Sequence, residues 1–144
     1  TENLACGEDK IDVNITFRAW DRSKGKWTRL KRELPFTWNR IFSLIAPAML
    51  DETSEENLRE LLNNEIRNRS QEYITFSMKK IYEMFQNIEI TDESMGRIQI
   101  QLRALGYIML SEKKHTASDK STYWTLTPYG NKIINQLLAI RKDV

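Results

Sequence analysis

The chain has few of the residues that build disulfides, metal sites and phosphate-binding loops. It contains one cysteine, one histidine and five glycines among 144 residues. Cys6 has no second cysteine to pair with, which favours a reducing compartment, so we expect a cytoplasmic protein. His115 has no Cys or second His near it, and the glycines are scattered singly. We therefore expect no zinc site, no phosphate-binding glycine loop and no cofactor.

Long apolar segments and catalytic motifs are also missing. No apolar run reaches the roughly 18 to 20 residues that a membrane-spanning helix needs, and there is no signal-peptide pattern. The sequence has no Ser-His-Asp set and no deaminase motif. We expect no enzymatic activity, no catalytic residues, no membrane contact and no small-molecule substrate. The 22 basic and 20 acidic residues leave a formal charge of +2, so any nucleic-acid binding must depend on local patches.

Residues 11–36 have the alternating pattern of a β-hairpin. Apolar residues at every second position predict two half-buried strands joined by a tight turn at residues 22–25. Gly25 supplies the left-handed conformation that such a turn needs. One register then satisfies both strands. It pairs Trp20 with Trp27, Phe17 with Leu30, Val13 with Leu34 and Ile11 with Phe36.

The outer face of this hairpin gathers cations and indoles, namely Arg18, Trp20, Trp27, Arg29 and Lys31. Interleaved cationic and aromatic side chains can follow phosphates and stack bases. Cross-strand Trp pairs and cations on an edge strand also stabilise a solvated hairpin and protect it from aggregation. An exposed aromatic patch can equally dock a neighbouring domain. All three interpretations of this face stay open.

Two amphipathic helices are predicted after the hairpin. Thr37 is a candidate cap for the first and Ser54 for the second, and Pro47 is expected to kink the first. The apolar positions at helical spacing are Trp38, Ile41, Phe42, Ile45 and Met49, followed by Leu58, Leu61, Leu62 and Ile66. Both stripes are expected to belong to the core.

From residue 74 onward, the predicted order of elements is that of a winged helix-turn-helix. We expect a strand at 74–76, a helix at 78–86, a second helix at 91–105, strands at 107–110 and 123–126, and a closing helix that reaches residue 140. The polar stretch 111–122 is longer than an ordinary hairpin loop and is predicted to be the wing. The expected fold class is α+β, with the hairpin and the residue-37 helix packed on the winged helix through Ile11, Val13, Phe17, Leu30 and Phe36.

The predicted helix at 91–105 has a core face and a mixed outward face. Thr91 is its candidate N-cap, and the outward positions are Gly96, Arg97, Ile100, Arg103 and Ala104. In helix-turn-helix proteins this face enters the major groove, which Arg97 and Arg103 suit. An exposed Ile100 instead suits a protein interface. Acidic residues in the first turn, Asp92 and Glu93, would repel phosphates, although they also complement the helix dipole.

The predicted wing carries Lys113, Lys114 and Lys120. Lysines in a wing can reach backbone phosphates, and they are also ordinary residues of a solvated loop. Their role is therefore left open between the two.

The run IQIQLRALGYIMLSEKK, followed by YWTLTPYGNKIINQLLAI, resembles the winged-helix end of certain bacterial multidomain proteins. ELPFTWNRIFSLIAPAMLDETSEENL resembles the segment that precedes the winged helix in those proteins. Their N-terminal part is an uncharacterised domain that is similar to TIR-like or nucleotide-binding α/β folds. The resemblance implies a C-terminal fragment, and it transfers no site residue. With the polar opening TENLACGEDK and no initiating Met, we expect a linker at 1–10, a hairpin and helix extension at 11–53, and a winged-helix domain at 54–144.

Two functions follow as expectations. The first is protein–protein interaction or oligomerisation, in which Ile100, Trp20, Trp27 and the closing amphipathic helix contact another protein domain or a second copy. The alternative is double-stranded DNA binding with a regulatory or sensory role. Its candidate residues are Arg97, Arg103, Lys113, Lys114, Lys120, Arg18, Arg29 and Lys31. The low net charge, the acidic opening of the helix at 91–105 and its Ile100 favour the first, whereas fold analogy favours the second.

Overall fold

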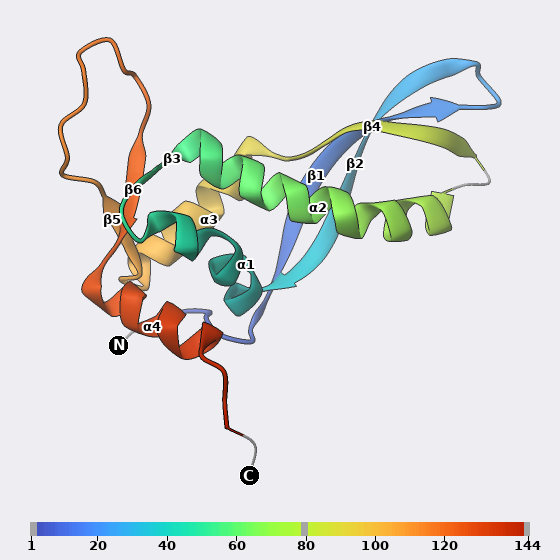
Figure 1. Ribbon diagram of the computed structural model, residues 1–144. Helices are drawn as coiled ribbons and strands as arrows, with labels where there is room; N and C mark the ends of the chain where they lie inside the picture. Colours follow the sequence, from blue (N-terminus) through green and yellow to red (C-terminus); the bar gives the residue numbers. More distant parts are fainter. Residues whose placement is uncertain (1–2, 79–80, 143–144) are drawn as a thin grey trace.

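The computed structural model describes residues 3–78 and 81–142 (Figure 1), and the fold is α+β. Its elements are β1 (Lys10–Asp21), β2 (Lys26–Thr37), α1 (Trp38–Ile45), a 3-10 helix η1 (Ala46–Met49), β3 (Thr53–Ser54), α2 (Glu55–Met78), β4 (Tyr82–Ile90), α3 (Asp92–Ala104), β5 (Ile108–Leu110), β6 (Tyr123–Leu126) and α4 (Pro128–Leu138). The strands form two antiparallel sheets with the orders β2-β1-β4 and β3-β6-β5.

The β1–β2 hairpin has the register predicted from its alternation. Trp20 pairs with Trp27 and Val13 with Leu34, and Gly25 lies in the left-handed region at φ 62°. The sequence pattern did not reveal what holds the turn. Asp21 Oδ1 accepts hydrogen bonds from the Ser23 hydroxyl (2.7 Å) and from the amides of Ser23 (2.9 Å) and Lys24 (3.1 Å). The hydrogen bond from the Ser23 hydroxyl, with smaller contributions from the two amides, holds the pKa of the Asp21 carboxyl below its ordinary value.

The prediction of a strand at 74–76 and a helix at 78–86 is wrong for the described residues. Helix α2 continues through 74–76 to Met78, and β4 takes the place of the predicted helix from residue 82; residues 79–80 lie outside the described residues. Ile74 is buried and extends the apolar stripe of Leu58 and Ile66 by helical steps. The free edge of β1 supplies the hydrogen-bond partners for β4. That pairing spans about 70 residues of sequence, so no local pattern could indicate it.

Strand β4 is irregular. Met84 and Asn87 both adopt φ 55°, and the β1–β4 register shifts opposite them, between Ala19 and Trp20 and between Thr16 and Arg18. Asn tolerates this left-handed conformation, whereas Met adopts it rarely. Such bulges twist an edge strand and protect it against edge-to-edge pairing.

Helix α2 lies along the first sheet and is bound to the end of β4 by polar side chains (Figure 1). The buried Asn63 accepts a hydrogen bond from the Ile90 amide at 2.8 Å. Arg59 donates to the Ile90 carbonyl (3.3 Å) and Arg67 to the Ile88 carbonyl (3.2 Å). These bonds satisfy backbone groups that an irregular edge strand would otherwise leave unpaired.

One hydrophobic core joins the hairpin to the helices. The predicted hairpin face is buried at Ile11, Val13, Phe17 and Phe36, and the partly buried Leu30 packs against the same core. The predicted caps are confirmed as well. Thr37, Ser54 and Thr91 accept from the amides of Arg40, Asn57 and Ser94, each at 3.1 Å. Helix α1 ends at Ile45, and Pro47 lies at the start of the η1 turn that follows, a position that proline favours.

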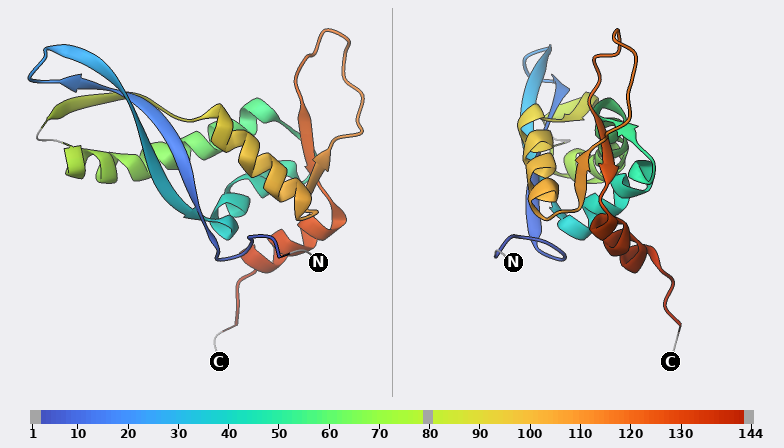
Figure 2. Two further views of the ribbon diagram at one scale, coloured as in Figure 1. Left: turned by 180° about the vertical axis from the view of Figure 1, so that it is seen from behind. Right: turned by 90° about the vertical axis from the view of Figure 1, so that its left-hand side faces the viewer.

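The second sheet carries a long loop, residues 111–122, between β5 and β6 (Figure 2). The views place this loop and the β1–β2 turn at opposite ends of the molecule. Helix α4 returns against the start of β5, where a Cβ on Gly130 would lie 1.9 Å from the Tyr107 carbonyl oxygen. Glycine is therefore required for this approach.

The N-terminal residues contact the helices. The backbone amides of Trp38 and Asn39 donate to the carbonyls of Asp9 (3.1 Å) and Gly7 (2.9 Å), and Gln101 donates to the Ala5 carbonyl at 2.8 Å. The division into a linker at 1–10, an extension and a winged-helix domain stays a prediction. None of the described helices is long and apolar enough to cross a membrane.

Candidate functional surfaces

Helix α3 presents an exposed face of mixed character. Its inner face is buried at Ser94, Met95, Ile98 and Leu102. On the outer face, Ile100 is 71% exposed, and Arg97, Arg103 and Ala104 are exposed as well. The outward residues predicted from the helical period therefore share one accessible surface.

The charges on this face are engaged within the chain. Arg97 forms an ion pair with Glu93 at 3.0 Å, and Asp92 forms one with Arg59 of α2 at 2.7 Å. The Arg103 guanidinium lies over the Trp124 ring, 5.5 Å from the ring centroid. Exposed pairs of this kind contribute little to stability. Their consequence is electrostatic, because Arg97 and Asp92, near Ile100, each have an oppositely charged partner in the chain, whereas Arg103 contacts the Trp124 ring.

Gly96 is unfavourable for the stability of α3, and no contact with the described residues requires a glycine there. It lies in the first half of α3, its φ is outside the left-handed region, and a Cβ built on it would meet no atom within 4 Å. A glycine inside a helix costs about 1 kcal/mol relative to alanine. Gly96, Ile100 and Ala104 are spaced four residues apart and so lie along one line of the helix. We call these three residues the α3 stripe.

The lysines of the predicted wing are only partly available. Lys113 forms an ion pair with Asp51, and this carboxylate raises the pKa of the Lys113 ammonium above its ordinary value. Lys120 donates to the Ala117 carbonyl at 3.2 Å. Lys114 is exposed. The loop therefore offers less free positive charge than its sequence suggests.

A cluster of side chains connects the 111–122 loop to Tyr123, which follows it, and to Glu52. The His115 ring stacks on Tyr123 with centroids 3.8 Å apart, and its Nε2 lies 3.0 Å from Glu52. The Tyr123 hydroxyl donates to Asp119 at 2.6 Å. This hydroxyl holds the pKa of the Asp119 carboxyl below its ordinary value, and the same bond raises the pKa of Tyr123. We call Glu52, His115, Asp119 and Tyr123 the wing cluster.

From the sequence, His115 is considered only as a metal ligand, and its partners are not predicted. Glu52 is far from His115 in the chain and carries no local signal for this contact, whereas Asp119 and Tyr123 lie within eight residues of it. No group of three or more His, Cys, Asp and Glu side chains in residues 3–78 and 81–142 is arranged to hold a metal ion.

The hairpin face consists of Arg18, Trp20, Trp27, Arg29 and Lys31, which the sheet register brings together. The Trp20 and Trp27 rings meet edge to face with centroids 5.6 Å apart, and both indoles are partly buried. Arg18 lies 5.0 Å above the Trp27 ring. Arg18 is also the direct cross-strand partner of Arg29, and Lys31 is that of Thr16. The indole pair is thus partly covered by a cation.

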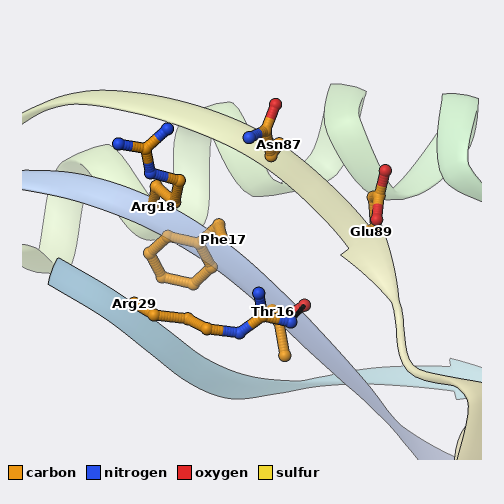
Figure 3. Close-up of a pocket in the computed structure, with 6 residues that line it drawn as sticks. All are labelled: Thr16, Phe17, Arg18, Arg29, Asn87 and Glu89. Carbon is orange, nitrogen blue, oxygen red and sulfur yellow. Dashed lines mark hydrogen bonds between the residues drawn. The ribbon is translucent and has the colours of Figure 1, made fainter. Parts of the chain in front are cut away.

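A hollow of about 320 Å³ adjoins these cations, at the Asn87 bulge of β4. It is lined by Thr16, Phe17, Arg18, Arg29, Asn87 and Glu89. Figure 3 shows the Arg29 side chain reaching across toward Thr16, with Arg18 directed toward β4. Arg29 donates a long hydrogen bond of 3.5 Å to the Thr16 hydroxyl. Asn87, whose backbone is in the left-handed region, lines the same hollow as the two arginines.

No protein-family model, curated protein or solved structure matches the chain.

Proposed function

We propose that the chain is a winged-helix module that acts in protein–protein interaction, and that α3 contacts a second copy of the chain. The order of elements supports the winged-helix assignment. The sheet β3-β6-β5 is accompanied by α1, α2 and α3, and the loop at 111–122 occupies the position of a wing. In this assignment α2 and α3 are the helix pair, and β4 is an insertion between them that joins the hairpin sheet.

The observation that carries the proposal is the α3 stripe. Ile100 is 71% exposed, and the space above Gly96 is empty in the isolated chain. Burying an isoleucine side chain contributes roughly 1.5 to 3 kcal/mol, and a glycine lets another helix approach closely. Because the neighbouring Arg97 and Asp92 are already paired within the chain, little uncompensated charge must be desolvated on contact.

A second copy fits the symmetry of this stripe. Gly96 and Ala104 lie four residues on either side of Ile100. When two such helices pack antiparallel about a two-fold axis, Ile100 meets Ile100 of the other copy, and each glycine faces an alanine. Two-fold interfaces require self-complementary patches of this kind.

Duplex DNA is the second candidate ligand of α3 and the wing. The exposed Lys114 at the projecting loop favours it, and Arg97, Arg103, Lys113 and Lys120 would complete the contact. The ion pairs of Arg97 and Lys113 count against it, since a phosphate must displace Glu93 and Asp51.

The test is the oligomeric state of an Ile100→Lys variant, measured by sedimentation velocity over a range of concentrations. Leu50→Lys is the matched control, because Leu50 is 64% exposed outside α3 and undergoes the same chemical change. We expect the wild-type chain and Leu50→Lys to form dimers and Ile100→Lys to be a folded monomer. A wild-type chain that stays monomeric at millimolar concentration, or an Ile100→Lys variant that still dimerises, rejects the proposal. Tighter duplex binding by Ile100→Lys with no change of mass supports the DNA alternative.

A further inference from the structure

The hairpin face carries positive charge that the chain leaves uncompensated. Arg18 and Arg29 are direct cross-strand partners, and like charges in this position destabilise a sheet. Among the described residues, no carboxylate forms an ion pair with Arg18, Arg29 or Lys31. This contrasts with α3 and the wing, where Arg97 and Lys113 are paired. Arg18 lies over the Trp27 ring and Arg29 bonds the Thr16 hydroxyl, so an anionic ligand can approach both guanidinium groups without breaking an ion pair.

The directions of the side chains fit a chain of anionic groups better than a single ion. Arg29 reaches toward Thr16, whereas Arg18 is directed toward β4, and the hollow lies between them (Figure 3). Every second residue of β2 lies on the outer face, so Lys31, Arg29 and Trp27 follow one another there at intervals of about 6.7 Å. Glu89 lies at the β4 side of the hollow and repels anions there. A polyanion is therefore expected to run along β1 and β2, away from Glu89.

The indole pair continues this row of cations. Trp27 follows Arg29 on the outer face, and Trp20 lies directly opposite Trp27. Only an unpaired nucleic-acid strand offers base faces to an aromatic side chain beside its backbone, since the bases of a duplex are stacked on one another. We propose that the hairpin face binds the phosphodiester backbone of a single-stranded nucleic acid, with the Trp20–Trp27 pair contacting a base. This site is independent of the α3 stripe.

The experiment measures binding of a labelled oligothymidylate by fluorescence anisotropy as a function of salt. The test variant is Arg18→Gln with Arg29→Gln. Its matched control is Lys132→Gln with Arg141→Gln, which removes the same charge from two exposed positions in and after α4. At 0.15 M salt we expect the test variant to bind about tenfold more weakly, and its salt slope to fall by about 1.4, or 0.7 per lost phosphate contact. The control should retain the wild-type slope.

Further measurements separate this site from a structural role and from other ligands. Arg29→Gln alone should weaken binding without lowering the thermal midpoint, because it removes a like-charge pair. Ile100→Lys should retain oligothymidylate binding, so that failure of the α3 proposal and failure of this one are distinguishable. The proposal is overturned by absence of binding at 50 mM salt, by equal losses in the test and control variants, or by duplex DNA binding as tightly as the single strand. Preferential binding of polyglutamate would assign the face to an acidic protein instead.

Discussion

Arginine and lysine occur both on the surface formed by α3 and the 111–122 loop, which we call the α3 and wing surface, and on the hairpin face. The two surfaces differ in whether these cations have carboxylate partners within the chain. On the first surface, Arg97 and Lys113 each have a carboxylate of the chain as partner. On the second, Arg18 and Arg29 lie opposite each other, and no carboxylate of the described residues forms an ion pair with either. By residue type alone, both surfaces are candidates for nucleic-acid binding. Their partners separate a surface suited to a neutral protein contact from one suited to a polyanion.

The largest expected effect is a loss of stability on the buried side of the hairpin, compared with almost none on its outer side. Phe17 is buried beneath the hairpin face, at 1% exposure, and packs against Phe85. Phe17→Ala should lower the free energy of unfolding by about 3 to 5 kcal/mol, as measured by urea denaturation. Arg29→Gln, on the outer side of the neighbouring strand, serves as the control and should leave it nearly unchanged. Equal losses in the two variants would show that the outer side is structural as well.

A second prediction concerns substitutions that remove the carboxylate partners on the α3 and wing surface, so that its cations become unpaired like those of the hairpin face. Glu93→Gln with Asp51→Asn frees Arg97 and Lys113 from their partners. If internal pairing is what keeps this surface from binding DNA, duplex affinity should rise by about fivefold per released cation at 0.15 M salt. Electrophoretic mobility shifts would measure it. Glu60→Gln with Glu65→Gln removes the same charge from α2, where these residues pair with Arg67 and Arg40.

If the two double variants gain duplex affinity equally, the gain results from the change in net charge and not from the release of Arg97 and Lys113. If neither gains, the α3 and wing surface is not a latent DNA site.

The sequence predicted those parts of the fold whose elements carry a local pattern, such as strand alternation or a helix cap. The hairpin register follows because both strands alternate, and Thr91 and Thr37 cap helices whose stripes are regular. Strand β4 escaped prediction because its partner is β1 and its bulges at Met84 and Asn87 break the alternation. The roles of Asp51, Glu52 and Asn63 depend on partners 27 or more residues away. Such contacts leave no spacing pattern, so the electrostatic contrast between the surfaces could not be foreseen.

The smallest expected effect concerns the loops at the two ends of the molecule. Asp21 holds the hairpin turn and Asp119 holds the wing, and the pKa of each carboxyl lies below its ordinary value of 3.8. A lowered pKa in the folded state stabilises the fold above pH 3.8, and this contribution is lost as the pH falls through the lowered pKa. Asp21→Asn and Asp119→Asn should each lower the thermal midpoint slightly at pH 7.

This deficit should shrink below about pH 3.8, as followed by circular dichroism melting from pH 7 to pH 2. A deficit that is the same at pH 2 as at pH 7 would mean that the two loops do not depend on the carboxylate charge.

The most direct test of the α3 proposal is a Gly96→Ala substitution with two readouts. In the Ile100→Lys background, where the chain is expected to be monomeric, the added methyl meets open space and should raise the free energy of unfolding by about 1 kcal/mol. In the otherwise wild-type chain, the same methyl crowds the other copy and should raise the dimer Kd about tenfold. A gain in stability with an unchanged dimer Kd would contradict the account, because Gly96 would then serve no contact through the α3 stripe.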